Sequence, residues 1–139
     1  MAYKALVRPK LEYCSAIWDP YQNSNKATLE KIQRRAARFV QNDHSRKSSV
    51  TKMLTNLRWE TLENRRTKLR LTSIYKEVHN LAPSNVKPLS NTTNRKTRNS
   101  HGPHLLDIPA FNKNCYQYSL YPRTTREWNL LPLETRDAP

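Results

Sequence analysis

Two histidines and a cysteine near the carboxyl end have side chains that could bind zinc. His101 and His104 lie three residues apart around a Gly-Pro pair, and Cys115 could supply a third ligand. A structural zinc site takes four ligands, however, and surface histidines that bind no metal are the more common arrangement. We therefore expect surface histidines, with no metal and no other cofactor.

Carboxylates are the second group that could do chemistry. Glu60 and Glu63 can share one face of a helix, but acids gather in the first turn of helices for electrostatic reasons alone. Two-metal catalysis needs carboxylates that converge on ions about 3.5–4 Å apart, and the aspartates of this chain are isolated from one another. Asp43-His44 lacks a glycine-flanked nucleophile turn. Because no catalytic arrangement of side chains is evident, we predict that the chain is not an enzyme.

Positive charge is the strongest feature of the composition. The 139 residues include 25 Lys and Arg against 11 Asp and Glu, a formal net charge of +14. Such an excess indicates a polyanionic partner. Nucleic acid, DNA or RNA, is favoured over a membrane because the cations are spread over separate segments and do not flank one strongly apolar face. A basic protein without a polyanionic partner is the alternative.

The clearest element that could position cations is a helix predicted over residues 27–40. Successive residues of a helix are rotated by about 100°, which places the apolar residues of this segment on one stripe. They are Leu29, Ile32, Ala36, Phe39 and Val40. The other side carries Lys31, Arg34, Arg35 and Arg38. A helix that buries the apolar stripe presents these four cations to solvent, where they can meet phosphates. A solvated charged face without a ligand is the competing interpretation.

Shorter elements precede this helix. Residues 3–18 have a mixed apolar pattern that Pro9 should kink or divide. A polar turn follows over 19–25, in which Ser24 or Asn25 can cap the next helix.

Two more helices are predicted after it. Ser48 or Ser49 should cap a short helix, and Thr61 should cap a long one that ends near Asn80 and Pro83. The apolar stripe of the long helix is Leu71, Ile74, Tyr75, Val78 and Leu81. Arg65 and Arg66 near its start are further candidate phosphate contacts.

The remainder divides into a basic linker over 83–103 and an aromatic-rich tail over 104–139. Short strands over 105–108 and 115–120 are predicted to form a hairpin, followed by one or two helical turns anchored by Trp128. Aromatic residues interleaved with cations suit nucleic-acid binding because bases stack on rings while Arg holds phosphates. The tail offers such a set in Tyr116, Tyr118, Tyr121, Arg123 and Arg126.

The predicted fold class is mainly α. We expect a helical domain of about four helices over 1–82, with the tail packed on these helices after the linker. Cys14 and Cys115 have no paired spacing, so we expect free, half-buried thiols. No membrane span or signal peptide is evident, which predicts an intracellular protein, nuclear or cytoplasmic. The oligomeric state is left open.

Four phrases of the sequence resemble, in order, the region after the palm of Jockey-like non-LTR (LINE-type) retrotransposon reverse transcriptases. They are LVRPKLEY at 6–13 with Trp18, LEKIQRRA at 29–36 with Arg38-Phe39, LRWETLE at 57–63 with Arg65-Arg66, and YPRTTREWN at 121–129 with Leu131-Pro132. Together they span nearly the whole chain.

The resemblance implies a thumb and post-thumb region that holds a template–primer duplex or the element RNA, with Arg34, Arg35, Arg38, Arg65 and Arg66 on matching phrases. It transfers no catalytic residue, because the Tyr-x-Asp-Asp motif of the palm is missing. Met1 opens almost directly into the first phrase, as expected of a truncated copy without its fingers–palm domain. The chain is thus expected to be a noncatalytic remnant of an RNA-directed DNA polymerase; the alternative is a vestigial structural or protein-interaction fragment.

Overall fold

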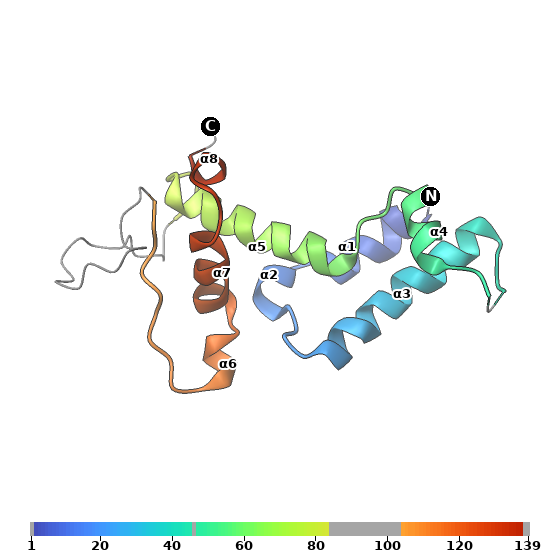
Figure 1. Cartoon of the computed structure of the whole chain (residues 1–139), viewed down its shortest axis with the longest axis horizontal. Coiled ribbons are helices and arrows are strands. Elements are labelled where there is room, and N and C mark those ends of the chain that lie inside the picture. Colours follow the sequence, from blue (N-terminus) through green and yellow to red (C-terminus); the bar gives the residue numbers. More distant parts are fainter. Residues whose placement is uncertain (1, 46, 84–103, 138–139) are drawn as a thin grey trace. The chain divides into compact units, whose positions relative to one another are not determined.

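The structure, a computed structural model, describes residues 2–45, 47–83 and 104–137 (Figure 1). These residues are mainly helical, which confirms the predicted fold class, and no β-strand occurs among them. The chain divides into two compact units, Met1–Lys68 and Leu69–Pro139, and the division falls inside the helix α5 (Leu62–Val78). The boundary predicted at residue 82 therefore lies within the second unit. The predicted linker lies, from residue 84 onward, outside the described residues.

Before α5, the first unit contains, in order, η1 (Tyr3–Val7), α1 (Arg8–Glu12), α2 (Ser15–Trp18), α3 (Asn23–Gln41) and α4 (Val50–Asn56). After α5, the second unit contains α6 (Asn114–Gln117), α7 (Leu120–Asn129) and α8 (Leu133–Arg136).

Pro9 lies next to the point where the first segment changes from a π-helix to an α-helix, but it does not break the segment, which stays helical up to Glu12. The part before α1 is a π-helix, in which the Arg8 N–H donates to the carbonyl of Tyr3 five residues earlier. Pro9 then lies in the first turn of α1, where a missing N–H costs no helical hydrogen bond. Cys14, at φ 51°, separates α1 from α2 in the left-handed region.

Side-chain caps begin α4 and α5 at the predicted residues. The Ser49 hydroxyl accepts the Lys52 N–H at 3.5 Å, and the Thr61 hydroxyl accepts the Asn64 N–H at 3.3 Å. The predicted cap of α3 is wrong: this helix already includes Ser24 and Asn25, and its N-cap residue Gln22 makes no side-chain capping bond.

Asparagine ends both long helices, as expected for a chain whose single glycine is Gly102. Asn42, at φ 50°, follows α3, and the next N–H donates to the Arg38 carbonyl at 3.1 Å. Asn80, at φ 56°, follows α5, and the next N–H donates to the Lys76 carbonyl at 2.7 Å. Asparagine tolerates this left-handed conformation better than most residues, so the helices close without glycine.

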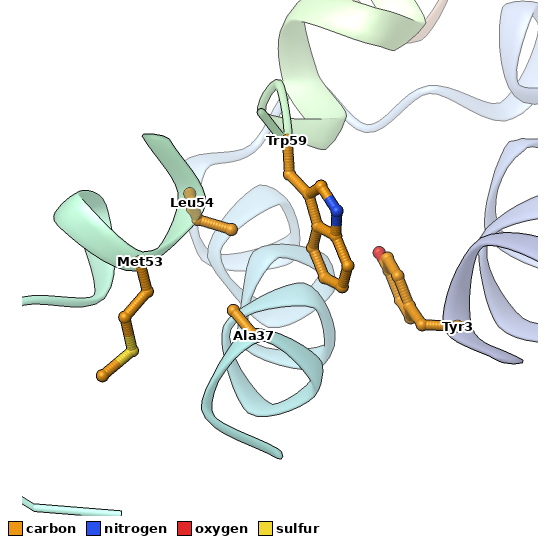
Figure 2. Packing of buried hydrophobic residues seen from close by; sticks show 5 residues of the cluster. All are labelled: Tyr3, Ala37, Met53, Leu54 and Trp59. Atoms are coloured by element: carbon orange, nitrogen blue, oxygen red, sulfur yellow. The ribbon is translucent and has the colours of Figure 1, made fainter. Parts of the chain in front are cut away.

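The core of the first unit forms around Trp59. Its ring stacks on Tyr3 with 4.6 Å between centroids, and Ala37 of α3 lies beside the indole (Figure 2). Met53 and Leu54 of α4 complete the buried cluster. This cluster fixes which face of α3 points inward.

The inward face of α3 combines a polar and an apolar residue, and the predicted apolar stripe is wrong in part: Ala36 packs against the core, but other members of the stripe face outward. Gln33 and Ala37 are the buried residues of the helix, whereas the expected core residues Ile32 and Phe39 are 38% and 78% exposed. The Gln33 side-chain amide donates to the Glu60 carbonyl at 2.8 Å, which holds α3 against the turn before α5.

The same face of α3 also contacts the start of α5, where it caps a backbone N–H and pairs with a carboxylate. Glu30 accepts the backbone N–H of Glu63 at 2.9 Å, and the Lys26 ammonium lies 2.7 Å from the Glu63 carboxylate. Helix N-termini leave their first N–H groups without intrahelical partners, and Glu30 satisfies one of them. The helix is consequently rotated by roughly a quarter turn from the predicted orientation, since Gln33 and Ala37 lie on average about 90° from the centre of the apolar stripe.

The second unit packs around Trp128, which the sequence identified as an anchor. Trp128 clusters with Ile74 of α5 and with Leu106, and its indole N–H donates to the His104 carbonyl at 2.8 Å. Asn129 accepts the Leu106 N–H at 3.1 Å and donates to the Leu106 carbonyl at 2.9 Å. Leu71, Tyr75 and Val78 of the predicted α5 stripe pack on this cluster, but Leu81, beyond the end of the helix, is 68% exposed.

The predicted tail hairpin is wrong. Residues 105–108 and 115–120 form no strand; the second range instead contains most of α6 and the start of α7. Pro122 is compatible with α7 because it lies in the first turn, where its missing N–H would have no helical partner. Cys14 and Cys115 are free, as predicted, but exposed.

Candidate nucleic-acid interface

The α3 helix presents the cations that sequence analysis selected. Lys31, Arg34 and Arg35 are exposed. None of the three side chains makes a hydrogen bond or ion pair with another residue that the structure describes. We call these three residues the α3 cation triad. Their charges face solvent, and no carboxylate in the described part of the chain forms an ion pair with them.

Helical geometry places the triad and Arg38 on one face. At about 100° per residue, Lys31, Arg34, Arg35 and Arg38 fall within an arc of about 100°. From Lys31 to Arg38 the helix rises about 10 Å, which matches roughly three phosphate steps at about 3.4 Å of rise per step along one strand. One helix face can therefore contact consecutive phosphates.

Arg38 differs from the triad because it also shapes the following loop. Its guanidinium donates to the Ser45 carbonyl at 2.6 Å, and its side chain is half-buried. Asp43 lies in the same loop, where hydrogen bonds, first from the Ser48 side chain and then from the Ser45 backbone, hold the pKa of its carboxyl below the ordinary value. Arg38 is therefore a positioning residue as well as a candidate contact.

Arg65 pairs with Glu12 through two hydrogen bonds, Nε to Oε1 and Nη2 to Oε2, the second at 3.0 Å. The hydrogen bond to Glu12 raises the pKa of Arg65 above its already high value, so this side chain stays charged. Because Glu12 neutralises this charge, Arg65 is a weaker candidate for phosphate contact than the α3 cation triad.

Arg66 is a correction to the predicted interface. Its side chain is 1% exposed and its Nε lies 2.6 Å from Oδ1 of Asp19, itself 3% exposed. A guanidinium enclosed in this way cannot reach a phosphate on the surface. The sequence alone does not reveal this role, because Asp19 lies 47 positions away and nothing in the spacing pairs the two residues.

Arg123 and Arg126 of the second unit are both engaged within that unit. The Arg123 Nε lies 3.4 Å from Glu127, and the Arg126 guanidinium lies over the ring of Phe111, 4.6 Å from its centroid. Of the tyrosines predicted beside them, Tyr121 donates to Glu77 at 3.4 Å. The three side chains thus have internal contacts, although Arg126 can keep its charge at the surface while stacked on an aromatic ring.

The candidate catalytic and metal-binding residues have ordinary structural partners. Glu60 pairs with Lys68 at 2.7 Å. The His104 ring lies 3.3 Å from Asp137, and His101 lies outside the described residues. No group of three or more His, Cys, Asp or Glu side chains that could hold a metal ion occurs in the described part of the chain.

Exposed cations outside the predicted set also occur in the first unit. Lys52 on α4 and Arg58, at φ 51°, are exposed. Their spacing matches no helical cation stripe, and only the surrounding fold shows that they face solvent.

Comparison with family models, curated proteins and solved structures finds no match to this chain. Among the described residues, no helix has the length and apolar character needed to cross a membrane.

Proposed function

We propose that this chain is a noncatalytic nucleic-acid-binding module that contacts DNA or RNA mainly through phosphates. The observation that carries the proposal is the α3 cation triad: Lys31, Arg34 and Arg35 are exposed on one helix face and unpaired among the described residues. Neutralising phosphates releases condensed counterions, which supplies most of the affinity in binding of this kind.

The net charge of +14 supports the same proposal. Such a field draws polyanions toward the protein over distances on the order of a Debye length, about 8–10 Å at physiological salt. The triad then provides a short-range contact surface. Phosphate contacts carry no sequence information, so we expect weak sequence preference.

The proposed parentage is the thumb and post-thumb region of a Jockey-like non-LTR retrotransposon reverse transcriptase. Its support is the order of the four phrases, which lie on η1 and α1, on α3, around the start of α5, and on α7. The DNA upstream of the Met1 codon tests this parentage. An open or decayed frame encoding Tyr-x-Asp-Asp is expected, and an intact unrelated promoter would contradict it.

The binding proposal is tested by fluorescence anisotropy with labelled duplex DNA, single-stranded DNA and RNA of one sequence and its shuffled version. We expect binding that weakens steeply between about 50 and 200 mM salt, with little difference between the two sequences. No binding at the low-salt end, or binding that salt does not change, would contradict the proposal.

A protein-interaction fragment is the second candidate. The observation that favours it is the exposure of Ile32 and Phe39 on α3, because large apolar side chains that gather on a surface commonly mark a docking site. Size-exclusion chromatography across protein concentrations, with and without added nucleic acid, distinguishes the candidates. A chain that self-associates and binds no nucleic acid would favour this one.

A further inference from the structure

An apolar groove runs between η1 and α3 in the first unit, with a volume of about 580 Å³. Its floor and walls are apolar and include Leu6, Val7, Ile32 and Phe39. Arg35 and Arg38 also line it. Leu6 is 65% exposed, so apolar surface on two adjacent helical elements faces solvent together. Its volume falls within the range of about 300–1,000 Å³ that is usual for ligand pockets.

The orientation of α3 creates this groove. Because Gln33 and Ala37 face the core, Ile32 and Phe39 are turned outward toward η1. Leaving a large apolar side chain partly exposed forgoes part of the favourable free energy of burying it. A partner that covers these residues would recover that free energy.

We propose that this groove binds the apolar face of an amphipathic helix that belongs to a partner protein and carries Asp or Glu along its flanks. A helix lays side chains at i, i+3 or i+4, and i+7 into a groove of this kind. The guanidinium groups of Arg35 and Arg38 supply charge that is complementary to acids, and a basic helix would be repelled there. The proposal goes beyond nucleic-acid binding and does not depend on it.

Three other occupants suit the groove less well. Membrane insertion uses apolar side chains that protrude from a surface, whereas this apolar surface is hollowed. A second copy would bring a further +14 charge toward the same cations. A nucleobase has polar edges, and the floor of the groove offers almost no polar atoms to bond with them.

The test uses the full chain and a panel of synthetic amphipathic peptides about 18 residues long, enough to form a helical face. All carry Leu or Phe at helical spacing, and their flanks carry either Glu or Lys. Fluorescence anisotropy should show that the Glu-flanked peptides bind and the Lys-flanked ones do not. The double variant Ile32→Ser/Phe39→Ser should weaken the binding at least about tenfold, since two buried apolar contacts are lost. The matched control Leu130→Ser, at a residue 84% exposed in the other unit, should leave it unchanged.

A charge exchange keeps the test decisive even if the double variant folds poorly. Arg35→Glu should weaken binding of the Glu-flanked peptides and allow the Lys-flanked peptides to bind, which loss of folding cannot produce. The proposal is overturned if no Glu-flanked peptide binds, or if Arg35→Glu changes neither affinity. It is also overturned if groove-dependent binding appears only with phosphatidylserine vesicles, single-stranded oligonucleotide or a second copy of the chain.

Discussion

The Arg66 guanidinium and the Asp19 carboxylate form an ion pair that is almost fully enclosed, 2.6 Å apart, in the first unit. Asp19 follows α2 and Arg66 lies in α5, so the pair joins two elements that are distant in the sequence. Basic residues that look equivalent in the sequence therefore have different roles, because Arg66 stabilises the fold while Arg34 and Arg35 face solvent.

Removing one partner of this pair should destabilise the protein strongly. Arg66→Ala removes the guanidinium that pairs with the enclosed Asp19 carboxylate, and breaking a buried ion pair by removing one partner costs about 3–5 kcal/mol. Replacing both partners, as Asp19→Leu with Arg66→Met, should recover most of that stability. Urea unfolding followed by circular dichroism measures the effect, with Arg34→Ala as the exposed control expected to stay within about 0.5 kcal/mol. If Arg66→Ala leaves stability unchanged and abolishes nucleic-acid binding, the structural role assigned to Arg66 is wrong.

The orientation of α3 can be tested by enlarging one of its buried residues. Ala37 is fully buried against Trp59, so Ala37→Leu should overpack the core and cost about 1–3 kcal/mol. Phe39→Ala, on the exposed side, should change stability by less than about 0.5 kcal/mol. Thermal and urea unfolding of both variants decides between the two orientations. A large loss in Phe39→Ala with none in Ala37→Leu would restore the apolar stripe as the buried face.

Stability at alkaline pH should depend on Tyr3. Burial of the hydroxyl raises the pKa of Tyr3 from 10.0 to about 12. Because the folded state resists deprotonation, the stability that Tyr3 contributes is complete below pH 10 and declines as pH rises from about 10 to about 12. Tyr3→Phe cannot ionise, so the comparison of its unfolding midpoint with that of the unaltered chain removes the contribution of other titrating groups. Identical pH profiles for the two proteins in this range would contradict the effect.

Local sequence signals predicted where the helices begin and end better than they predicted which face of each helix is buried. Ser49 and Thr61 as caps and Asn80 as a terminator act within a few residues, so they are visible in the sequence. The inward face of α3 was not predictable from apolar periodicity, because its buried residue Gln33 is polar and bonds to a carbonyl 27 positions away. A polar stripe at helical spacing, from Lys26 through Glu30 and Gln33, was the available signal.

In the tail and in the candidate interface, too, local features were predictable and features that depend on distant contacts were not. The alternation of Tyr116 and Tyr118 suggested a strand. The following residues instead form α7, which buries Pro122 and Trp128. Tertiary burial therefore overrode the local pattern. Lys31, Arg34 and Arg35 are exposed, as predicted. They stay in solvent even though α3 is rotated from its predicted orientation, because the solvent-facing side of the helix spans a wide arc. The burial of Arg66 could be predicted only if its distant partner, Asp19, were known.

The most direct measurement of the central claim is the salt dependence of duplex binding in two charge-matched triple variants. One variant is Lys31→Ala/Arg34→Ala/Arg35→Ala on α3, and the other is Arg95→Ala/Lys96→Ala/Arg98→Ala, which removes the same charge elsewhere in the chain. The α3 variant should keep its fold, because its residues are exposed and Ala favours helix. Its binding should weaken, and the slope of log K against log salt should flatten by about 2–3 units at about 0.9 per lost contact, with a smaller change in the second variant. If the α3 variant keeps both affinity and slope while the second variant loses them, α3 is not the nucleic-acid interface.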